Sequence, residues 1–286
     1  MLDTKQELRI DPRTTVGAVT LGVQDLTETT RFYNEAIGLD VISLEDRQVR
    51  LGVDEQTLVV LEHRPDGRAY HNAPGLYHLA LLLPSRADLG LWLDQYSRKG
   101  LRLTGVADHL VSEALYLNDP EGNGIEIYRD RPREDWPHRD GELLMDTLAL
   151  DVYKLLEDAA KTEFNGMSEG TKMGHIHLKV NDLPRAQAFY QDVVGFDFML
   201  GMPTAGFMSA GGYHHHLGMN TWHSLNVQPR PKDALGLISY QIVLPDAEAF
   251  DGHLANLEKR GAQIDLTGEH PQLVDPSGNV IEFVSA

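Results

Sequence analysis

The chain of 286 residues contains no cysteine, which excludes disulfide bonds, thiolate metal ligands and a cysteine nucleophile. Basic residues are also few: 25 Lys and Arg stand against 43 Asp and Glu, for a formal net charge of -18. This balance disfavours nucleic acid and anionic membranes as partners. No stretch approaches the roughly 18 apolar residues of a membrane-spanning helix, and residues 1–7 lack the apolar run of a secretory signal. We therefore expect a cytoplasmic protein that binds neither nucleic acid nor membrane.

What the sequence does contain is an internal repeat. Residues 17–40 recur as residues 174–197 without insertion or deletion, with matching Gly, Asp and Phe-Tyr positions. A second motif is also doubled, since residues 119–126 (DPEGNGIE) return as residues 275–282 (DPSGNVIE). A duplication of this kind indicates an architecture built from repeated structural units. The Asp-Pro-x-Gly-Asn part of the second motif is typical of a β-turn and is interpreted as structural only.

Each copy of the first motif predicts a strand followed by a helix. Apolar residues alternate with period two over residues 17–23 and 174–180, which is typical of a half-buried strand. Each helix is expected to begin after an aspartate N-cap and to end at a glycine. These residues are Asp25 and Gly38 in the first copy, and Asp182 and Gly195 in the second.

The same plan of strand, helix and three strands recurs in variant form, with a helix expected near residues 87–99. We predict an α+β protein of four βαβββ modules that form two half-open β-barrels. The modules are residues 14–66, 74–130, 172–224 and 235–286. The first pair belongs to a domain of residues 1–133 and the second pair to a domain of residues 172–286, with a linker over 134–171. A helix is expected in the linker at residues 145–161.

This arrangement resembles the vicinal oxygen chelate superfamily of glyoxalases, bleomycin resistance proteins and extradiol dioxygenases. Within it, the likeness is greatest to the two-domain catechol 2,3-dioxygenases. The segments that carry it are residues 75–78 (GLYH), 108–120 (DHLVSEALYLNDP) and 211–218 (GGYHHHLG).

The resemblance implies metal ligands on the first strand of one module and on the first and last strands of its partner. In chain order, those positions hold Ala18, His78 with Glu126, His175, and Ser239 with Glu282. Pairing the second module with the third brings His78, Glu126 and His175 into one cavity. Two histidines and one carboxylate are the ligand set of non-haem Fe(II) with open coordination positions, and Mn(II) accepts the same set. A lone histidine is more often structural, but these two occupy equivalent strand positions in different modules.

The resemblance also implies catalytic groups around the metal. A tyrosine is expected ten residues before the glutamate ligand, where Tyr116 stands, and His109 is the candidate for a histidine in the preceding loop. An acid/base histidine is expected among His214, His215 and His216. Strand alternation favours His215 as the inward residue, although which of the three faces the metal is left open.

The function implied is an extradiol ring-cleaving dioxygenase that inserts both atoms of O2 into a small aromatic diol. One alternative is a glyoxalase-type metal-dependent isomerase or lyase, and another is a metal-free protein that binds and sequesters a drug. The glyoxalase type commonly has a fourth, acidic ligand on the strand where this chain has its three consecutive histidines. The substrate is left open, as is assembly into a homo-oligomer.

Overall fold

A computed structural model describes residues 9–286 and contains two large β-sheets and five α-helices in that part of the chain. The first sheet has the strand order β16 (Gln272–Val274), β17 (Val280–Ser285), β15 (Gly236–Leu244), β1 (Thr15–Val23), β4 (Gln56–His63), β3 (Gln48–Val53) and β2 (Asp40–Leu44). The second has the order β12 (Asp197–Met202), β13 (Ala205–Ser209), β14 (Leu217–Asn220), β11 (Lys172–Lys179), β5 (Gly75–Leu82), β8 (Gly124–Asp130), β7 (Ser112–Asn118) and β6 (Gly105–Asp108).

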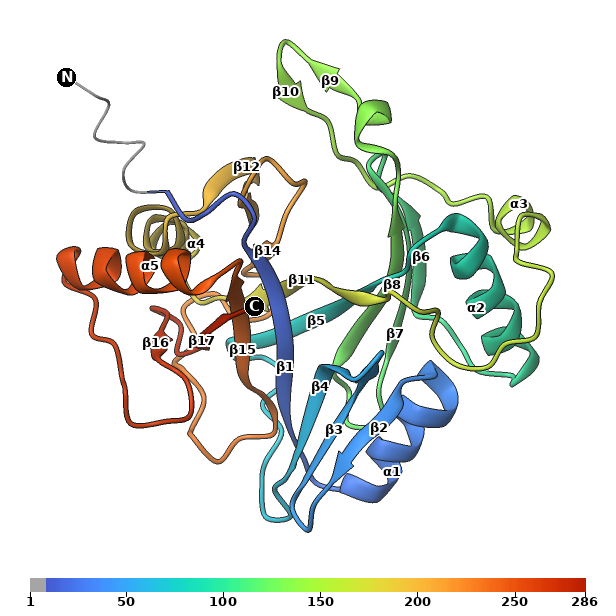
Figure 1. Ribbon diagram of the computed structural model, residues 1–286, viewed down its shortest axis with the longest axis horizontal. Helices are drawn as coiled ribbons and strands as arrows, with labels where there is room; N and C mark the ends of the chain where they lie inside the picture. The colour runs from blue at the N-terminus through green and yellow to red at the C-terminus, as the bar shows by residue number, and fades with distance from the viewer. Residues whose placement is uncertain (1–8) are drawn as a thin grey trace. The chain divides into compact units, whose positions relative to one another are not determined.

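Strands of the second and third sequence modules therefore belong to one sheet, and strands of the first and fourth to the other (Figure 1). The α-helices are α1 (Leu26–Arg31), α2 (Arg86–Arg98), α3 (Val152–Glu157), α4 (Leu183–Ala188) and α5 (Ala247–Lys259), and a short hairpin is formed by β9 (His138–Arg139) and β10 (Glu142–Leu143). The predicted α+β class is confirmed. The described part of the chain divides into two compact units, one of residues 22–66 and 78–174, the other of residues 9–21, 67–77 and 175–286.

The repeated helices begin and end where the sequence predicts. Asp25 accepts a hydrogen bond from the Glu28 amide, and Asp182 accepts one from the Arg185 amide, so both aspartates are N-caps. Each α-helix continues into a π-helical segment, Phe32–Ile37 after α1 and Phe189–Val194 after α4. Gly38 (φ 98°) and Gly195 (φ 101°) then end the helices in the left-handed conformation that glycine adopts most easily. The π-helical turns were not predicted.

The two doubled motifs contact each other. In one unit, Asp119 is buried and accepts hydrogen bonds from the Tyr33 hydroxyl (3.3 Å) and the Asn123 side chain (2.8 Å). Burial raises the pKa of Asp119 to about 6, although these donors partly oppose the shift. The Asp-Pro-x-Gly-Asn turn is thus anchored to the helix of the first motif, in agreement with its structural interpretation.

The other unit repeats this contact with its own residues. Tyr190 donates to Asp275 over 3.0 Å, and the Asn279 side chain donates to the same carboxylate over 2.9 Å. The Tyr190 hydroxyl also lies 2.9 Å from the hydroxyl of Tyr240. The residues that the two copies share therefore build the scaffold.

The linker differs from the prediction. A helix was expected over residues 145–161, but α3 covers only Val152–Glu157. Asp151 is the reason for the late start, because its carboxylate accepts from the Lys154 amide as an N-cap. Before it, Leu148 pairs with Asp108 as an isolated antiparallel bridge. The first part of the predicted helix is therefore extended chain.

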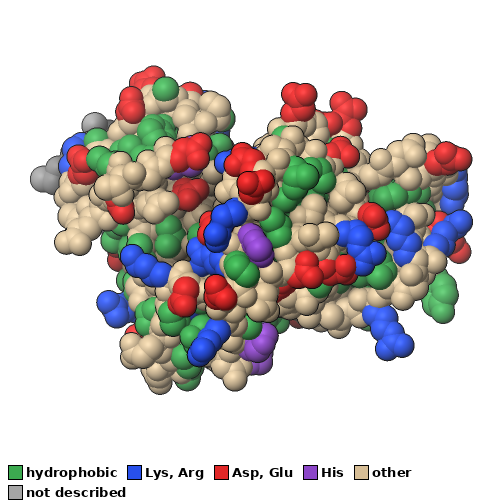
Figure 2. All heavy atoms as spheres, turned by 90° about the horizontal axis from the view of Figure 1, so that it is seen from below, with side chains coloured by type: hydrophobic (Ala, Val, Ile, Leu, Met, Phe, Trp, Pro, Cys, Tyr) green, Lys and Arg blue, Asp and Glu red, His purple; other side chains and the backbone are tan. Residues whose placement is uncertain are grey.

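No helix in residues 9–286 is long and apolar enough to cross a membrane. On the face seen in Figure 2, basic side chains are interspersed with acidic ones and do not gather into one continuous patch.

Candidate metal centre

Two neighbouring parallel strands position His78 and Glu126. On β5 and β8, Ala80 is the register partner of Glu126 and His78 is the partner of Gly124. His78 and Ala80 lie on the same face of their strand, since side chains alternate with period two. Both ligand candidates are therefore on one face of the sheet, and both are buried.

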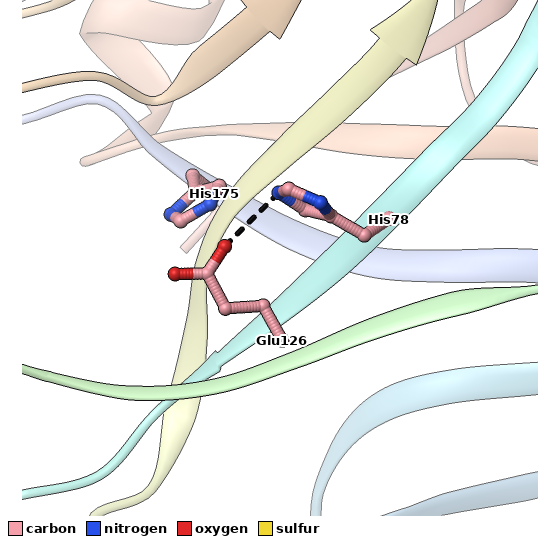
Figure 3. A group of neighbouring side chains, drawn as sticks. All are labelled: His78, Glu126 and His175. Atoms are coloured by element: carbon pink, nitrogen blue, oxygen red, sulfur yellow. Dashed lines mark ion pairs between the residues drawn. The ribbon is translucent and has the colours of Figure 1, made fainter. Parts of the chain in front are cut away.

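The three sequence-predicted ligands come together. The Nε2 atom of His78 lies 3.0 Å from Oε2 of Glu126. His175 on β11 adds a third donor, and one ligand atom from each of the three residues lies within 4.8 Å of the others. Figure 3 shows the three side chains pointing toward one another. Their exposed fractions are 6%, 3% and 1% in chain order, so the donors are shielded from solvent.

This group fits a divalent metal ion. Bonds of about 2.1 Å to nitrogen and oxygen place adjacent octahedral donors about 3.0 Å apart. The 3.0 Å between His78 and Glu126, which is the length of a hydrogen bond, is therefore also compatible with two ligands of one ion. Burying a carboxylate among apolar strands is costly unless a cation or hydrogen-bond donors compensate it. Two imidazoles and one carboxylate would leave a divalent ion with a net charge of about +1, which favours an anionic ligand.

The equivalent positions of the other modules lack this donor set. Ala18 and Ser239 are buried and bring no imidazole. Glu282 accepts a hydrogen bond from the Gln272 side chain over 3.2 Å, across a register pair that matches Tyr116 and Glu126. The duplicated carboxylate is thus satisfied by an amide, with no metal required.

Tyr116 and His109 lie next to the same group. Tyr116 on β7 is directly opposite Glu126 on β8, and its ring centroid is 5.6 Å from that of His78. The Nε2 atom of His109 lies 2.7 Å from the Tyr116 hydroxyl. Its Nδ1 atom lies 2.8 Å from the backbone carbonyl of Asp146. The structure therefore places both sequence-predicted residues in one hydrogen-bonded chain.

The histidine-rich segment is not a strand, and the expectation based on strand alternation is wrong. Gly211 (φ 59°) and Gly212 (φ 66°) form a turn, and β14 begins only at Leu217. His214 and His216 are buried and His215 is half-buried. His216 has a structural contact, since its Nδ1 accepts a hydrogen bond from the Ala210 amide over 3.1 Å.

His215 nevertheless lies beside a candidate ligand. Its ring centroid is 4.2 Å from that of His175, compared with 6.3 Å for His214. The ring of Phe207 packs against His215 with a centroid distance of 5.0 Å. Of the three consecutive histidines, His215 is thus the one that combines proximity to His175 with partial exposure.

One buried histidine was missed by the sequence reasoning. His177 follows His175 by two residues on β11, so period-two alternation would have placed both on one face. Its Nε2 atom is 3.0 Å from the Asn220 side-chain nitrogen. Aromatic rings surround it, with centroids 5.0 Å away in Tyr77, 5.8 Å in Phe207 and 5.9 Å in Trp222. Tyr77, Phe207 and Trp222 thus form an aromatic cluster around His177, on the face of β11 that also carries His175.

Comparison with known proteins gives consistent matches. The family model described as the Glyoxalase/Bleomycin resistance protein/Dioxygenase superfamily matches residues 15–127 and 172–283. A catechol-2,3-dioxygenase of Bacillus subtilis (strain 168) is 43% identical over 279 residues, which cover 95% of this chain and 97% of that protein. Biphenyl-2,3-diol 1,2-dioxygenase 3 of Rhodococcus globerulus is 30% identical over 132 residues, covering 43% of this chain and 68% of that protein.

A solved structure supports the fold. Glyoxalase I from Zea mays superposes with a TM-score of 0.57 at 16% sequence identity, covering 95% of this chain and 92% of that chain. At this identity the likeness extends to the backbone arrangement and not to the chemistry.

Proposed function

Because the chain belongs to the Glyoxalase/Bleomycin resistance protein/Dioxygenase superfamily, we propose that it is an extradiol ring-cleaving dioxygenase acting on a small aromatic diol and O2. Its α+β fold is the vicinal oxygen chelate fold, with curled half-barrel sheets, as expected from the sequence. The observation that carries the proposal is the buried group of His78, Glu126 and His175, in a chain 43% identical to a catechol-2,3-dioxygenase.

His78, Glu126 and His175 would hold a non-haem Fe(II), and Mn(II) suits the same donors. When bound, such a metal would supply open coordination positions for the diol and O2. The protein's contribution is to fix three donors on one side and to keep them buried.

Tyr116 and His109 would orient the diol. Their hydrogen-bonded chain lies beside His78, so a diol oxygen next to the metal would come within reach of the Tyr116 hydroxyl. A half-buried hydroxyl that is held in advance can accept a hydrogen bond from a diol O–H and so fix the orientation of the diol. We assign Tyr116 this role, and His109 the role of holding the Tyr116 hydroxyl in place.

His215 would act as the acid/base group. Its ring lies beside His175 and it is half-buried, so it can exchange a proton with a ligand at the metal and with solvent. A histidine suits this role because its unperturbed pKa is near neutrality. Its neighbour His216 is held by a backbone amide and is assigned no chemistry.

The proposal is tested by reconstitution with Fe(II) under anaerobic conditions, followed by catechol and air. We expect one O2 to be consumed per diol, with a yellow ring-fission product, and neither change in the Glu126→Gln variant. The main rival, a glyoxalase-type isomerase, is tested in parallel with a hemithioacetal of glutathione and Ni(II) or Zn(II). Isomerisation of the hemithioacetal without O2 uptake on any diol would overturn the proposal.

A further inference from the structure

Three residues of the predicted linker, Asp146, Thr147 and Leu148, lie against the loop that carries His109; we call them the strap. Leu148 and Asp108 exchange two backbone hydrogen bonds, of 2.9 Å and 3.0 Å. This pair fixes the strap to the end of β6, directly before His109. Leu148 therefore adds one paired residue to the sheet at β6, the strand that pairs with the Tyr116 strand β7.

The strap also determines which nitrogen of His109 carries the proton. A backbone carbonyl has no proton to donate, so the 2.8 Å contact between Asp146 O and His109 Nδ1 requires a proton on Nδ1. In the neutral ring, Nε2 then has a lone pair and must accept. The Tyr116 hydroxyl, 2.7 Å away, is accordingly the donor to Nε2.

Charged residues hold the backbone around His109. The Asp108 carboxylate accepts from the Leu110 amide (2.9 Å) and from Arg131 (2.7 Å). Arg131 in turn lies 3.6 Å from the buried Glu113. Leu110 has a φ of 71°, a conformation that a leucine rarely adopts and that the surroundings must enforce. The loop is thus built to hold one geometry.

We propose that the strap is a positioning element that keeps His109 protonated on Nδ1, so that the Tyr116 hydroxyl donates to His109 and presents its oxygen lone pairs to the substrate. The role toward substrate rests on the proposed function, but the protonation pattern does not. Free neutral histidine favours the opposite tautomer, with the proton on Nε2. That tautomer would make Nε2 the donor and Tyr116 the acceptor, and would release the Tyr116 proton toward another partner.

The protonation pattern is measured directly by 15N NMR of histidine ring nitrogens in the full-length chain, labelled with 15N-histidine and free of added metal. The chain has 13 histidines, so the His109 signals are identified by their absence in His109→Gln. We expect an Nδ1 of the protonated type and an Nε2 of the unprotonated type. A proton on Nε2, or a mixture of tautomers as in a free histidine, would overturn the inference, and this measurement requires no strap variant to fold.

Strap variants then test the cause. Leu148→Pro removes the amide that bonds to Asp108, and we expect it to shift His109 toward the free-histidine mixture. Leu148→Val keeps that amide, and Ala149→Pro places a proline one residue later, where the structure shows no amide hydrogen bond to lose. Both controls should keep the Nδ1-protonated form. An unchanged tautomer in folded Leu148→Pro would contradict a positioning role for the strap.

Activity separates this inference from the proposed function. With a diol substrate, Leu148→Pro should lower kcat by about 100-fold, the typical effect of a small misplacement of a catalytic group, with little change in bound metal. The two controls should retain wild-type kcat. If the tautomer is as expected but the wild-type chain cleaves no diol, the proposed function fails and the positioning role stands. If diols are cleaved while His109 carries its proton on Nε2, the positioning role fails and the function stands.

Discussion

The two duplicated glutamates allow the metal assignment to be tested with a control inside the same chain. Glu126 is 3% exposed and lies 3.0 Å from His78, whereas Glu282 is partly exposed and is bonded to Gln272. Both stand in the same motif on equivalent strands. Substituting each with glutamine keeps the side-chain size, removes the charge and replaces one acceptor oxygen by an NH2 group.

The expected magnitude follows from binding linkage. A metal present at 100 times its Kd stabilises the folded chain by about 2.7 kcal/mol. Changing a partner outside the ligand shell typically weakens metal binding 10- to 100-fold, so we take about 100-fold as the minimum for Glu126→Gln. At the same metal concentration this variant would gain only about 0.4 kcal/mol. Without metal it should be about as stable as the wild type, because the amide oxygen still accepts from His78 and a buried charge is removed.

The assay is thermal or denaturant unfolding with and without the metal, together with metal content after dialysis. The wild type should respond to metal by several degrees, roughly 2–4 °C per kcal/mol for a chain of this size class. Glu282→Gln should respond as the wild type does, within about 0.5 kcal/mol. Equal losses in the two variants, or a loss only in Glu282→Gln, would refute the assignment of the metal to Glu126.

Further predictions concern acid/base catalysis, pH and the scaffold. His215→Ala should lower turnover by about 10²–10⁴-fold with normal metal content, and near-normal turnover would assign His215 a structural role. His253 is buried beside Phe283 with its Nε2 unpaired, and burial lowers its pKa to about 4 from 6.5. Its neutral form is therefore fully compatible with folding above pH 6.5, and its contribution to stability is lost as the pH falls from 6.5 toward 4, by up to about 3 kcal/mol. Asp119, whose raised pKa acts in the opposite sense over nearly the same range, is present in both chains. The difference in free energy of unfolding between the wild type and His253→Leu should therefore fall by that amount between pH 6.5 and pH 4, and a difference that does not change with pH would refute the assignment. Tyr33→Phe removes a donor to the buried Asp119 and should lower the free energy of unfolding by about 1–3 kcal/mol, as measured by denaturant titration; an unchanged value would show that water replaces the hydroxyl.

The features that the sequence predicts well are those set by local chemistry. The N-caps Asp25 and Asp182 and the terminal glycines Gly38 and Gly195 act within a few residues of their own position. Helix α2, expected near residues 87–99, is found at Arg86–Arg98 for the same reason. The π-helical turn after Arg31 leaves no comparable signal, since its residues are compatible with an ordinary helix.

The predictions that were wrong concern segments in which glycine residues, or pairing with a distant strand, override the local sequence pattern. Three consecutive histidines before an apolar stretch suggest a strand, but Gly211 and Gly212 take positive φ values and delay the strand to Leu217. His215 still lies beside His175, although not for the reason of alternation. In the linker, Leu148 pairs with Asp108 instead of entering a helix. A backbone carbonyl such as that of Asp146 has no sequence signature, so its contact with His109 could not be anticipated.

A comparison of the two copies, residue by residue, distinguishes the residues that hold the fold from those to which we assign chemistry. Both copies keep the tyrosine–aspartate contact, of 3.3 Å at Asp119 and 3.0 Å at Asp275, because each turn needs an anchor whether or not a metal is nearby. The residue opposite the glutamate differs. In one copy Gln272 donates to Glu282, while in the other Tyr116 contacts His109 and Glu126 contacts His78. The Gln272 amide donates directly to the Glu282 carboxylate, and this hydrogen bond occupies an oxygen that a metal would need. The copies thus differ at the residue opposite the glutamate as well as at the two histidine positions, where Ala18 and Ser239 stand. In the copy with the proposed metal site, a phenol bonded to a histidine takes the place of the amide beside the glutamate.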